Sequence, residues 1–455
     1  MSLTPNSEYG VRPRVWFAAY QILWHLLLPL AFVRLAWRAR HSIQYLSYLP
    51  ERLGFGYKKP ISQKAVWVHA VSVGETRAAQ PLIEAYLARG ESILLTHMTL
   101  NGRRTGAQLF AKAIASRQIC QVYLPYDLCW SVDRFLKAFQ PKLGLFMETE
   151  AWPTVVFRCA EIDLPLFLVN ARLSERSARR INRFGKAGRA LFQGFAGILA
   201  QTVFDAERYQ SLGVKSVEII GNLKFDVPLD QSLVQQGQAW KQELHVAQRL
   251  MVCAASTRDG EEAIILEAWK DLLLSNTFAV APLLCLVPRH PERFSEVADQ
   301  IHGAGLNFCR RSEWAGTPKE TSDLEVILGD SMGEMPMYYS AADLVVMGGS
   351  LLPFGGQNLI EACAAGCPVL LGKHTYNFQQ AALDALEMGA AKRIHGDLLL
   401  GESIALIEDL KSLLLNTDEL ARMALAAKKY TLEHQGATKK LLAALDRQNF
   451  SLTKS

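Results

Sequence analysis

The fold is decided by residues 344–371, which read LVVMGGSLLPFGGQNLIEACAAGCPVLL. A short apolar run, Leu344 to Met347, is followed by a loop with paired glycines, by a helical pattern that starts near Asn358, and by a second apolar run, Pro368 to Leu371. Paired glycines let the backbone approach an anion, and the N–H groups at a helix start then face that anion. This order indicates a nucleotide-binding α/β unit, with Glu361 placed to accept from a ribose hydroxyl. A plain strand-to-helix turn is the alternative reading of the same glycines.

The length and composition indicate a globular protein with more than one domain. A chain of 455 residues is too long for one hydrophobic core. Half of the residues are hydrophobic, and there is neither a low-complexity tract nor a repeat of solenoid length. The formal net charge of +5 is small, and no basic stripe is interleaved with aromatic residues, so we expect no nucleic-acid partner. A membrane surface suits this composition better.

The eight cysteines are scattered and lack the paired spacing of a zinc site. They are Cys120, Cys129, Cys159, Cys253, Cys285, Cys309, Cys363 and Cys367. We therefore expect reduced cysteines of a cytosolic protein, and neither a metal nor a cofactor. Cys363 and Cys367 lie four residues apart on the helix expected after the glycine loop, where packing is the favoured role.

The N-terminal region departs from the pattern of a soluble protein. Residues Val15 to Val33 are mostly Trp, Phe, Leu, Ile and Ala, interrupted by Gln21, His25 and Pro29. This length can cross a bilayer, but the polar interruptions leave open a helix that lies in the membrane interface, and a buried N-terminal helix is a third reading. The basic residues that follow the apolar stretch place the rest of the chain in the cytoplasm; these residues are Arg34, Arg38 and Arg40. A cleaved signal peptide fits poorly, because no small-residue cleavage site follows.

Beyond residue 50 the chain alternates apolar runs with helical patterns, which predicts parallel sheets in a doubly wound α/β fold. The first series of strands is expected at 65–71, 93–96, 122–124, 143–147 and 166–170, and the second at 251–254, 283–287, 326–328, 344–347 and 369–371. We predict an N-terminal anchor with its basic flank at 1–50, a first Rossmann-like lobe at 51–225, a linker at 226–247 and a second lobe with terminal helices at 248–455. Ligands of such sheets bind beyond the carboxyl ends of the strands.

The loops after the strands of the first lobe are rich in carboxylates. Glu75 follows the strand at 65–71 near an expected helix start, where a carboxylate is either a helix N-terminal charge or a general base. Glu148 and Glu150 follow the strand at 143–147, and Arg172 follows the strand at 166–170. Paired acids in one cleft can divide the roles of proton acceptor and electrostatic stabiliser, so we favour a functional role for the set.

The loops of the second lobe favour an anionic ligand. Arg289 is expected to bind a phosphate in a bidentate manner, whereas Arg293 is expected only to pair with Glu292 or with solvent. His290 is equally compatible with a structural and a functional role. Lys224, between the two series of strands, could neutralise negative charge on a leaving group, although an exposed lysine is the simpler reading by itself.

Seven motifs, in this order, resemble the Kdo transferases, which attach 3-deoxy-D-manno-octulosonic acid (Kdo) to the lipid A precursor of Gram-negative bacteria. The resemblance covers nearly the whole chain from the N-terminal anchor onward. The motifs are HAVSVGET at 69–76, YLPYD at 123–127, METE at 147–150, NARLS at 170–174, KFD at 224–226, VPRHPERF at 287–294 and the glycine loop at 348–361.

The resemblance implies an inverting glycosyltransferase of the GT-B fold, two Rossmann-like lobes facing a cleft, working at the cytoplasmic face of the cell inner membrane. Its donor would be CMP-Kdo and its acceptor a lipid A precursor, without a metal. By position, Glu75 would be the general base, and Glu150 and Lys224 would support the transition state. The positions implied for binding CMP are Pro288, Arg289, Met332, Gly333, Glu334, Asn358, Leu359, Ile360 and Glu361.

The chain departs from the family pattern at three positions. Ala151 and Thr154 replace the usual Leu and Asn after the second glutamate, which suggests an acceptor side of different shape, and Gln357 replaces the usual His of the glycine loop. Glutamine cannot titrate, so a proton-transfer role at that position is in doubt. The alternatives are another membrane-associated GT-B transferase or epimerase that uses a UDP-sugar, and an inactive nucleotide-binding scaffold. The intact Glu75, Glu150 and Lys224 argue against the scaffold.

Overall fold

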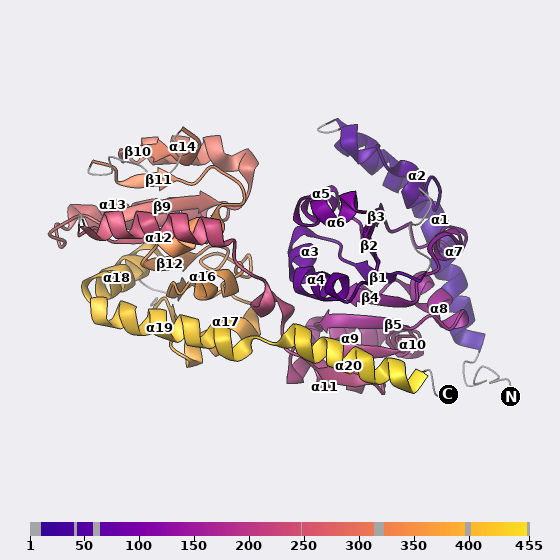
Figure 1. Ribbon diagram of the computed structural model, residues 1–455. Coiled ribbons are helices and arrows are strands. Elements are labelled where there is room, and N and C mark those ends of the chain that lie inside the picture. Colours follow the sequence, from indigo (N-terminus) through magenta and orange to yellow (C-terminus); the bar gives the residue numbers. More distant parts are fainter. Residues whose placement is uncertain are drawn as a thin grey trace. The chain divides into compact units, whose positions relative to one another are not determined.

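A computed structural model describes residues 11–40, 43–57, 64–246, 248–313, 323–395 and 402–452. The chain forms two compact units. Unit 1 comprises residues 1–227 and 435–455, and unit 2 comprises residues 228–434. Each unit has a seven-stranded sheet in its described part, and all strand pairs in both sheets are parallel. The predicted α/β fold with two Rossmann-like lobes is therefore confirmed (Figure 1).

The sheet of unit 1 has the strand order β3-β2-β1-β4-β5-β6-β7. Its strands are β1 (Val66–His69), β2 (Ile93–His97), β3 (Ile119–Tyr123), β4 (Leu143–Met147), β5 (Leu166–Ala171), β6 (Gly197–Ala200) and β7 (Val217–Ile219). Its helices include α1 (Val11–Ala39), α2 (Leu49–Arg52), α3 (Val73–Ala78), α4 (Gln80–Ala88), α5 (Leu100–Leu109), α6 (Ala111–Ala115), α7 (Cys129–Phe139), α8 (Pro153–Glu161), α9 (Glu175–Arg183), α10 (Gly185–Gln193), α11 (Val203–Ser211) and α20 (Ala437–Leu452), with 3-10 turns η1 (Ile43–Tyr45) and η2 (Leu223–Asp226).

The sheet of unit 2 has the order β10-β11-β9-β8-β12-β13-β14. Its strands are β8 (Met251–Thr257), β9 (Leu283–Pro288), β10 (Phe308–Arg310), β11 (Val326–Leu328), β12 (Leu344–Met347), β13 (Val369–Leu371) and β14 (Ala391–Arg393). The helices are α12 (Gln231–Val246), α13 (Glu261–Leu274), α14 (Phe294–Gly303), α15 (Met335–Ala341), α16 (Ile360–Ala364), α17 (Gln379–Glu387), α18 (Glu402–Leu415) and α19 (Thr417–His434), with 3-10 turns η3 (Pro291–Arg293) and η4 (Arg311–Glu313).

Both sheets are buried on their two faces, which explains why the strands read as continuous apolar runs rather than as alternating patterns. In β1, Trp67 joins the core on one face of the sheet, whereas Val66 and Val68 join the core on the other. In β4, Phe146 and Leu145 divide in the same way. Successive side chains of a strand point to opposite faces, so each strand ties two hydrophobic cores together.

The structure differs from the predicted organisation at the linker and at the C-terminus. Residues 226–247, expected to be a linker, include the 16-residue helix α12, which packs against α15 within unit 2. The terminal helix α20, expected in the second lobe, belongs to unit 1, where Leu441 and Leu445 enter one of the two cores. Helix α1 extends beyond the predicted 15–33 at both ends.

Candidate active site

The carboxylates predicted in unit 1 lie at one edge of its sheet. Strand β1 pairs with β4, and β4 pairs with β5, all in parallel. The loops that follow these three strands therefore lie side by side at the carboxyl edge of the sheet. They carry Glu75, then Glu148 and Glu150, then Arg172. The structure thus brings together the acids that the sequence placed after separate strands.

Glu75 is held at the start of α3 by a reciprocal cap. The Ser72 hydroxyl accepts from the Glu75 N–H at 3.3 Å and donates to Glu75 Oε1 at 3.0 Å, while the Val71 N–H donates to Oε2 at 2.8 Å. These bonds fix the carboxylate and satisfy N–H groups at the helix start. Burial raises the pKa of Glu75 to about 7, the Val71 N–H opposes this, and the charges of Glu150 and Glu148 raise the pKa further. Glu75 is therefore a capping residue at the start of α3 whose carboxylate titrates near neutral pH, with its pKa of about 7.

Glu148 is the most strongly paired acid of the site. Its Oε1 lies 2.8 Å from Lys224 Nζ, and its Oε2 lies 3.3 Å from Arg172 Nε. Burial alone would raise its pKa, but the two cations outweigh burial and hold the pKa of Glu148 below its usual value. From the sequence, Glu148 was expected in the pair of acids after β4 but not among the catalytic residues. Its backbone, in the left-handed region at φ 54°, turns the chain sharply at the end of β4.

Glu150 occupies a different environment. Its Oε2 accepts from Trp152 Nε1 at 2.9 Å and lies 3.8 Å from Nε2 of the fully buried His69. Burial lowers the pKa of His69 to about 3, so this histidine is neutral and does not form an ion pair with the acid. Burial is also the main reason that the pKa of Glu150 is raised, with the Glu148 charge adding to it against the Trp152 bond. The neighbouring acids Glu148 and Glu150 therefore have pKa values shifted in opposite directions.

Lys224 is placed by two asparagines. The Asn222 side chain accepts from the Lys224 N–H at 3.0 Å and starts the short turn η2. The Asn170 side chain, fully buried at the end of β5, accepts from the Leu223 N–H at 3.0 Å. Lys224 is thus not the exposed lysine of the simpler reading. Its side chain is 16% exposed and is directed to Glu148.

In unit 2, the residues predicted to bind a nucleotide follow β9, β11 and β12, at the carboxyl edge of the second sheet. Pro288 ends β9, and Arg289 follows it with an exposed side chain. Met332 is 64% exposed, Gly333 has φ 89°, and Glu334 precedes α15 and accepts from Arg311 Nη2 at 2.7 Å. Strand β8 lies between β9 and β12, so the loops that follow β9 and β12 lie at the same edge of the sheet, on the two sides of β8.

The first part of the glycine loop is occupied by a carboxylate of the protein itself. Glu261, fully buried at the start of α13, accepts from the N–H groups of Gly349 at 2.6 Å, Leu351 at 3.0 Å and Leu352 at 3.3 Å. The N–H groups of these three residues therefore bind a carboxylate of the protein, whereas from the sequence an anion was expected at the N–H groups at the start of the following helix. A Cβ at Gly348 would lie 2.4 Å from the Ser256 carbonyl oxygen, so glycine is required there for close packing of the loop on β8.

The second part of the loop leads into α16, which begins at Ile360, two residues after the predicted start near Asn358. The Asn358 side chain accepts from the Ile360 N–H at 3.2 Å and donates to Glu361 Oε1 at 3.0 Å. Leu359 and Ile360 are buried and hold this turn on the core. Asn358 and Glu361 are thus joined to each other, which orients both side chains.

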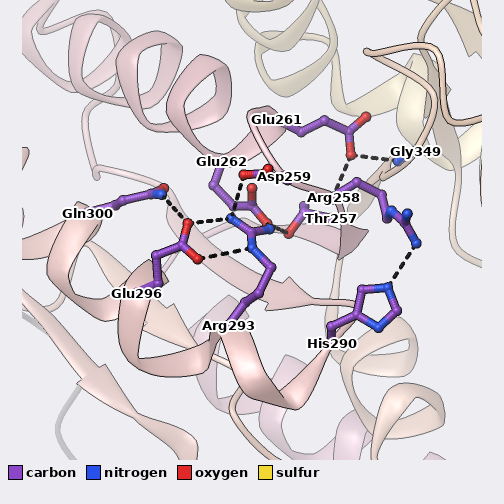
Figure 2. A network of polar contacts seen from close by, with 10 residues as sticks. All are labelled: Thr257, Arg258, Asp259, Glu261, Glu262, His290, Arg293, Glu296, Gln300 and Gly349. Atoms are coloured by element: carbon purple, nitrogen blue, oxygen red, sulfur yellow. Dashed lines mark hydrogen bonds and ion pairs between the residues drawn. The ribbon is translucent and has the colours of Figure 1, made fainter. Parts of the chain in front are cut away.

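A polar network anchors the loops after β8 and β9 (Figure 2). Arg293 lies between three carboxylates, with Glu262 at 2.7 Å, Glu296 at 2.9 Å and Asp259 at 3.4 Å. The expectation that Arg293 pairs only with Glu292 or solvent is therefore wrong. Arg258 contacts His290, with Nη1 and Nε2 separated by 2.9 Å. Burial and the charge of Arg258 lower the pKa of His290, so this histidine is neutral near pH 7.

The three departures from the family pattern have separate structural roles. Gln357 is half-buried against Gly349, where its Nε2 lies 3.1 Å from the position that a Cβ would take. Ala151 packs on one core of unit 1. Thr154 is fully buried; its hydroxyl donates to the Asp127 carbonyl at 2.7 Å and accepts from Gln21 of α1 at 2.7 Å. Thr154 therefore holds α1 in place.

The chain is similar to known proteins of one family. A family model described as 3-deoxy-D-manno-octulosonic-acid transferase (kdotransferase) matches residues 47–227. The 3-deoxy-D-manno-octulosonic acid transferase of Bordetella pertussis is 42% identical over 423 residues, which cover 92% of this chain and 96% of the relative. The enzyme of the same name from Haemophilus influenzae is 34% identical over 439 residues, which cover 95% and 98% of the two chains.

Solved structures support the fold. A UDP-GlcNAc 2-epimerase from Neisseria meningitidis aligns with a TM-score of 0.55 at 15% identity over 84% of this chain and 100% of its own. A glycosyltransferase from Rickettsia africae aligns with a TM-score of 0.55 at 11% identity over 87% of this chain and 100% of its own. At these identities the likeness shows a shared GT-B architecture alone. The full-length relatives at 42% and 34% identity show more: the chain belongs to the 3-deoxy-D-manno-octulosonic acid transferase family, glycosyltransferases that transfer Kdo in lipopolysaccharide biosynthesis.

Proposed function

We propose that the enzyme transfers Kdo from CMP-Kdo to a sugar hydroxyl of a lipid A precursor, with inversion at the anomeric carbon and with Glu75 as the general base. The observation that carries the base assignment is the position of Glu75: a capped, oriented carboxylate with a pKa of about 7, beside two further acids at the carboxyl edge of the sheet. A base is most effective when its pKa lies near the working pH.

The reaction is a single displacement in this proposal. The acceptor oxygen forms a bond to the anomeric carbon of Kdo as the bond from that carbon to the phosphate oxygen of CMP breaks. The electron pair of the broken bond leaves with CMP, and the acceptor proton passes to the Glu75 carboxylate. No metal takes part in this scheme.

The neighbouring residues supply charge for the transition state. Positive charge develops on the Kdo ring as CMP departs, and Glu150 is the acid assigned to stabilise it. Lys224 is assigned to the departing phosphate, and its pairing with Glu148 at 2.8 Å keeps its ammonium group directed to the site. Glu148 is added to this set as the residue that positions Lys224.

Unit 2 is assigned the donor nucleotide. Arg289, exposed after β9, would contact the phosphate, and the joined pair Asn358 and Glu361 would contact the ribose or the base. Because Glu261 occupies the N–H groups of Gly349, Leu351 and Leu352, the glycine loop would shape the floor of the nucleotide site rather than bind the phosphate through these groups.

The membrane location is also part of this proposal. We place the enzyme at the cytoplasmic face of the inner membrane, held there by α1. Within the described residues, α1 has the length and apolar composition that crossing a membrane requires. The exposed arginines at its C-terminal end, Arg34, Arg38 and Arg40, match an anionic cytoplasmic leaflet.

The direct test is to incubate the purified full-length protein with CMP-Kdo and a lipid A precursor, with UDP-sugars as donor controls, and to measure the product mass. We expect Kdo addition from CMP-Kdo alone, and the mass gives the number of sugars added. The anomeric configuration follows from NMR of the product. Transfer from a UDP-sugar instead would overturn the donor assignment.

The base assignment has its own variants. Glu75→Gln retains a group of the same size that can fill the cap, and it should lower kcat by about 10²- to 10⁴-fold while CMP still binds. Glu84→Gln, which changes an exposed carboxylate on the neighbouring helix α4, is the matched control and should leave kcat unchanged. Normal transfer by Glu75→Gln would remove Glu75 from the role of base.

A further inference from the structure

Helix α1 has two faces of different character. Large apolar side chains are exposed along one stripe; they are Val15, Ile22, Leu23, Leu26, Leu27, Leu30, Val33 and Trp37. Intervals of three, four or seven residues keep side chains on one side of a helix. Such intervals separate Val15, Ile22, Leu26, Leu30, Val33 and Trp37 along the chain. A contiguous apolar stripe of this length on a water-exposed surface marks a site of interaction with a protein or a membrane.

The opposite face of α1 is bound to unit 1 by polar contacts. Tyr20 donates to Asp127 Oδ2 at 2.7 Å. The Gln21 amide donates to Thr154 Oγ1 at 2.7 Å and to the Asp127 carbonyl at 3.2 Å, and its oxygen accepts from the Cys129 N–H at 2.9 Å. Tyr20 and Gln21 therefore have partners elsewhere in unit 1, in the loop after β3 and at the starts of α7 and α8.

Asp127 makes this attachment specific. The residue is 1% exposed, and it also accepts from the N–H groups of Thr154 at 2.9 Å and Val155 at 3.1 Å. One carboxylate thus joins the start of α8 to the middle of α1. The motif YLPYD at 123–127, which the proposed chemistry does not use, has this role through its last residue.

Apolar contacts extend the attachment along most of the helix. Phe17 meets Phe157 of α8 edge to face at 5.4 Å between ring centres, and Trp24 contacts Tyr126 with tilted rings whose centres are 5.9 Å apart. Further along, Leu28 and the buried Leu35 join a small core with Leu128. The attached face therefore runs from Phe17 to Leu35, which is most of the length that would be needed to cross a bilayer.

A helix cannot cross the hydrocarbon of a bilayer and keep these contacts, because unit 1 would have to enter the hydrocarbon with it. Detaching α1 would also leave the amide of Gln21 without its partners in an apolar solvent and remove one donor from buried Asp127, which costs several kcal/mol by the desolvation of polar groups. Keeping the contacts leaves only the exposed stripe for the lipid.

We propose that α1 lies in the plane of the membrane interface, docked on unit 1 through Asp127, with its apolar stripe immersed in one leaflet of a phospholipid bilayer. The exposed Arg34, Arg38 and Arg40 and the exposed Trp37 sit at the C-terminal end of the stripe, where cations meet lipid phosphates and an indole suits the headgroup region. This inference rests on the membrane location proposed above and selects the interfacial helix from the readings that the sequence left open.

The decisive measurement is the side of the membrane on which the N-terminus lies. The full-length protein, with a protease-cleavable epitope placed before Met1, is bound to sealed vesicles of phosphatidylethanolamine and phosphatidylglycerol, so that the catalytic units are outside. We expect the protease to remove the epitope without detergent, because a helix lying in the interface leaves its N-terminus outside. An epitope that is cleaved only after detergent is added would overturn the inference, because it shows a helix that crosses the bilayer.

The apolar stripe is tested by flotation on the same vesicles. Leu26→Glu should reduce the bound fraction at least tenfold while circular dichroism and the thermal midpoint stay those of the wild type. Leu425→Glu in α19 is the matched control, because Leu425 is 68% exposed and Leu26 is 69% exposed, and it should bind like the wild type. Unchanged flotation of Leu26→Glu would overturn the role of the stripe.

The two proposals fail in different ways. If the wild-type protein does not float with vesicles at all, both the membrane location and the docked anchor are wrong. If it floats but its N-terminal epitope is protected, the membrane location stands and the docked anchor is wrong. Kdo transfer to the lipid A precursor is measured separately and is independent of both outcomes.

Discussion

At the scale of single residues, the acids of the candidate site are distinguished by their surroundings rather than by their type. Glu148 is held ionised by Lys224 and Arg172, whereas burial raises the pKa of Glu75 and of Glu150. Environments that push the pKa values of neighbouring acids apart are a mark of acid–base sites. This division supports different roles for carboxylates that the sequence alone could not rank.

The pH dependence of transfer should report Glu75. Its pKa is about 7, and only the ionised form accepts a proton, so kcat/KM should rise with pH and level off above about pH 7. The measurement is a pH profile of kcat/KM with CMP-Kdo. A profile that is flat from pH 5 to about pH 9 would contradict the assignment.

Glu75 should also make the protein less stable at high pH. The pKa is raised from 4.5 to about 7 on folding, so the folded state binds the proton more tightly and stability falls as pH rises between these values. Glu75→Gln removes this loss, and we expect its free energy of unfolding at pH 8 to exceed that of the wild type by about 2 kcal/mol. Urea titrations at pH 5 and about pH 8 check this, with Glu84→Gln as the control. An equal difference at both pH values would rule out titration of Glu75 as the cause.

Lys224→Met should destabilise unit 1, because it leaves the 9% exposed side chain of Glu148 with Arg172 as its remaining cation. Removing one partner of a largely buried ion pair costs roughly 3 kcal/mol. The double variant Lys224→Met with Glu148→Gln should recover most of this loss, since no buried carboxylate is left without its lysine and the side chain of Arg172 is 43% exposed. Urea unfolding of the four proteins of this cycle measures the coupling. A double variant as unstable as Lys224→Met alone would show that the ion pair is not the cause.

At the scale of elements, the sequence predicted most of the inner strands and missed three of the four edge strands. The runs at 143–147, 326–328, 344–347 and 369–371 match the observed bounds of β4, β11, β12 and β13, because each is a compact apolar run in the middle of a sheet. The strands β6, β7, β10 and β14 were not predicted. Strand β6 (Gly197–Ala200) is a short buried inner strand, whereas β7, β10 and β14 are edge strands of three residues each that contain charged or polar residues.

The glycine loop shows why a local pattern was insufficient at the candidate site. Its glycines were interpreted as a phosphate cradle, yet the acid that fills the first part of it, Glu261, lies 88 residues before Gly349 in the sequence. Glu148 was placed in the right loop, but its partner Lys224 comes from another loop of the same unit. Sequence spacing predicts which side chains share a sheet edge, whereas pairing across loops requires the fold.

Glu261→Ala should loosen the glycine loop. The carboxylate accepts from three loop N–H groups and from the Arg258 N–H at 2.9 Å, and its loss would leave buried donors unsatisfied. We expect a loss of about 3 kcal/mol in the stability of unit 2 and faster amide exchange at Gly349 and Leu351. Glu267→Ala, an exposed position on the same helix α13, is the control. Unchanged exchange at Gly349 in Glu261→Ala would contradict the structural role of this carboxylate.

At the scale of the whole molecule, unit 2 is one continuous segment, 228–434, whereas unit 1 is built from both ends of the chain. The sequence predicted two lobes but assigned the terminal helix to the second lobe. Helix α20 follows α19 after a short break, and nothing local in its sequence shows that Leu441 and Leu445 fill a core formed by residues some 220 to 380 positions earlier. The return of the C-terminal segment to unit 1 depends on tertiary packing and is therefore not visible in the local sequence.

A fragment of residues 228–434 should therefore fold alone and bind CMP, because it contains a complete sheet with its covering helices and all the candidate nucleotide residues. Isothermal titration with CMP measures this, with Arg289→Ala as the variant expected to weaken binding. A fragment of residues 1–227 should be poorly soluble, since it lacks α20 and exposes an apolar core. An unfolded fragment 228–434 would show that the unit depends on the rest of the chain.

The return of the chain has a consequence for the evolution and engineering of the enzyme. Asp226, just before the chain leaves unit 1, accepts from the N–H groups of Gly436 at 2.7 Å and Thr438 at 2.6 Å, just after the chain comes back. Both junctions of unit 2 are thus fastened at one carboxylate. Unit 2 of a relative could therefore be exchanged as a cassette if the two splice points, after Val227 and before Gln435, leave Asp226 and its two partners in place. If the proposed roles of the two units hold, the specificity for the sugar nucleotide would then change while Glu75 and its neighbours stay unaltered.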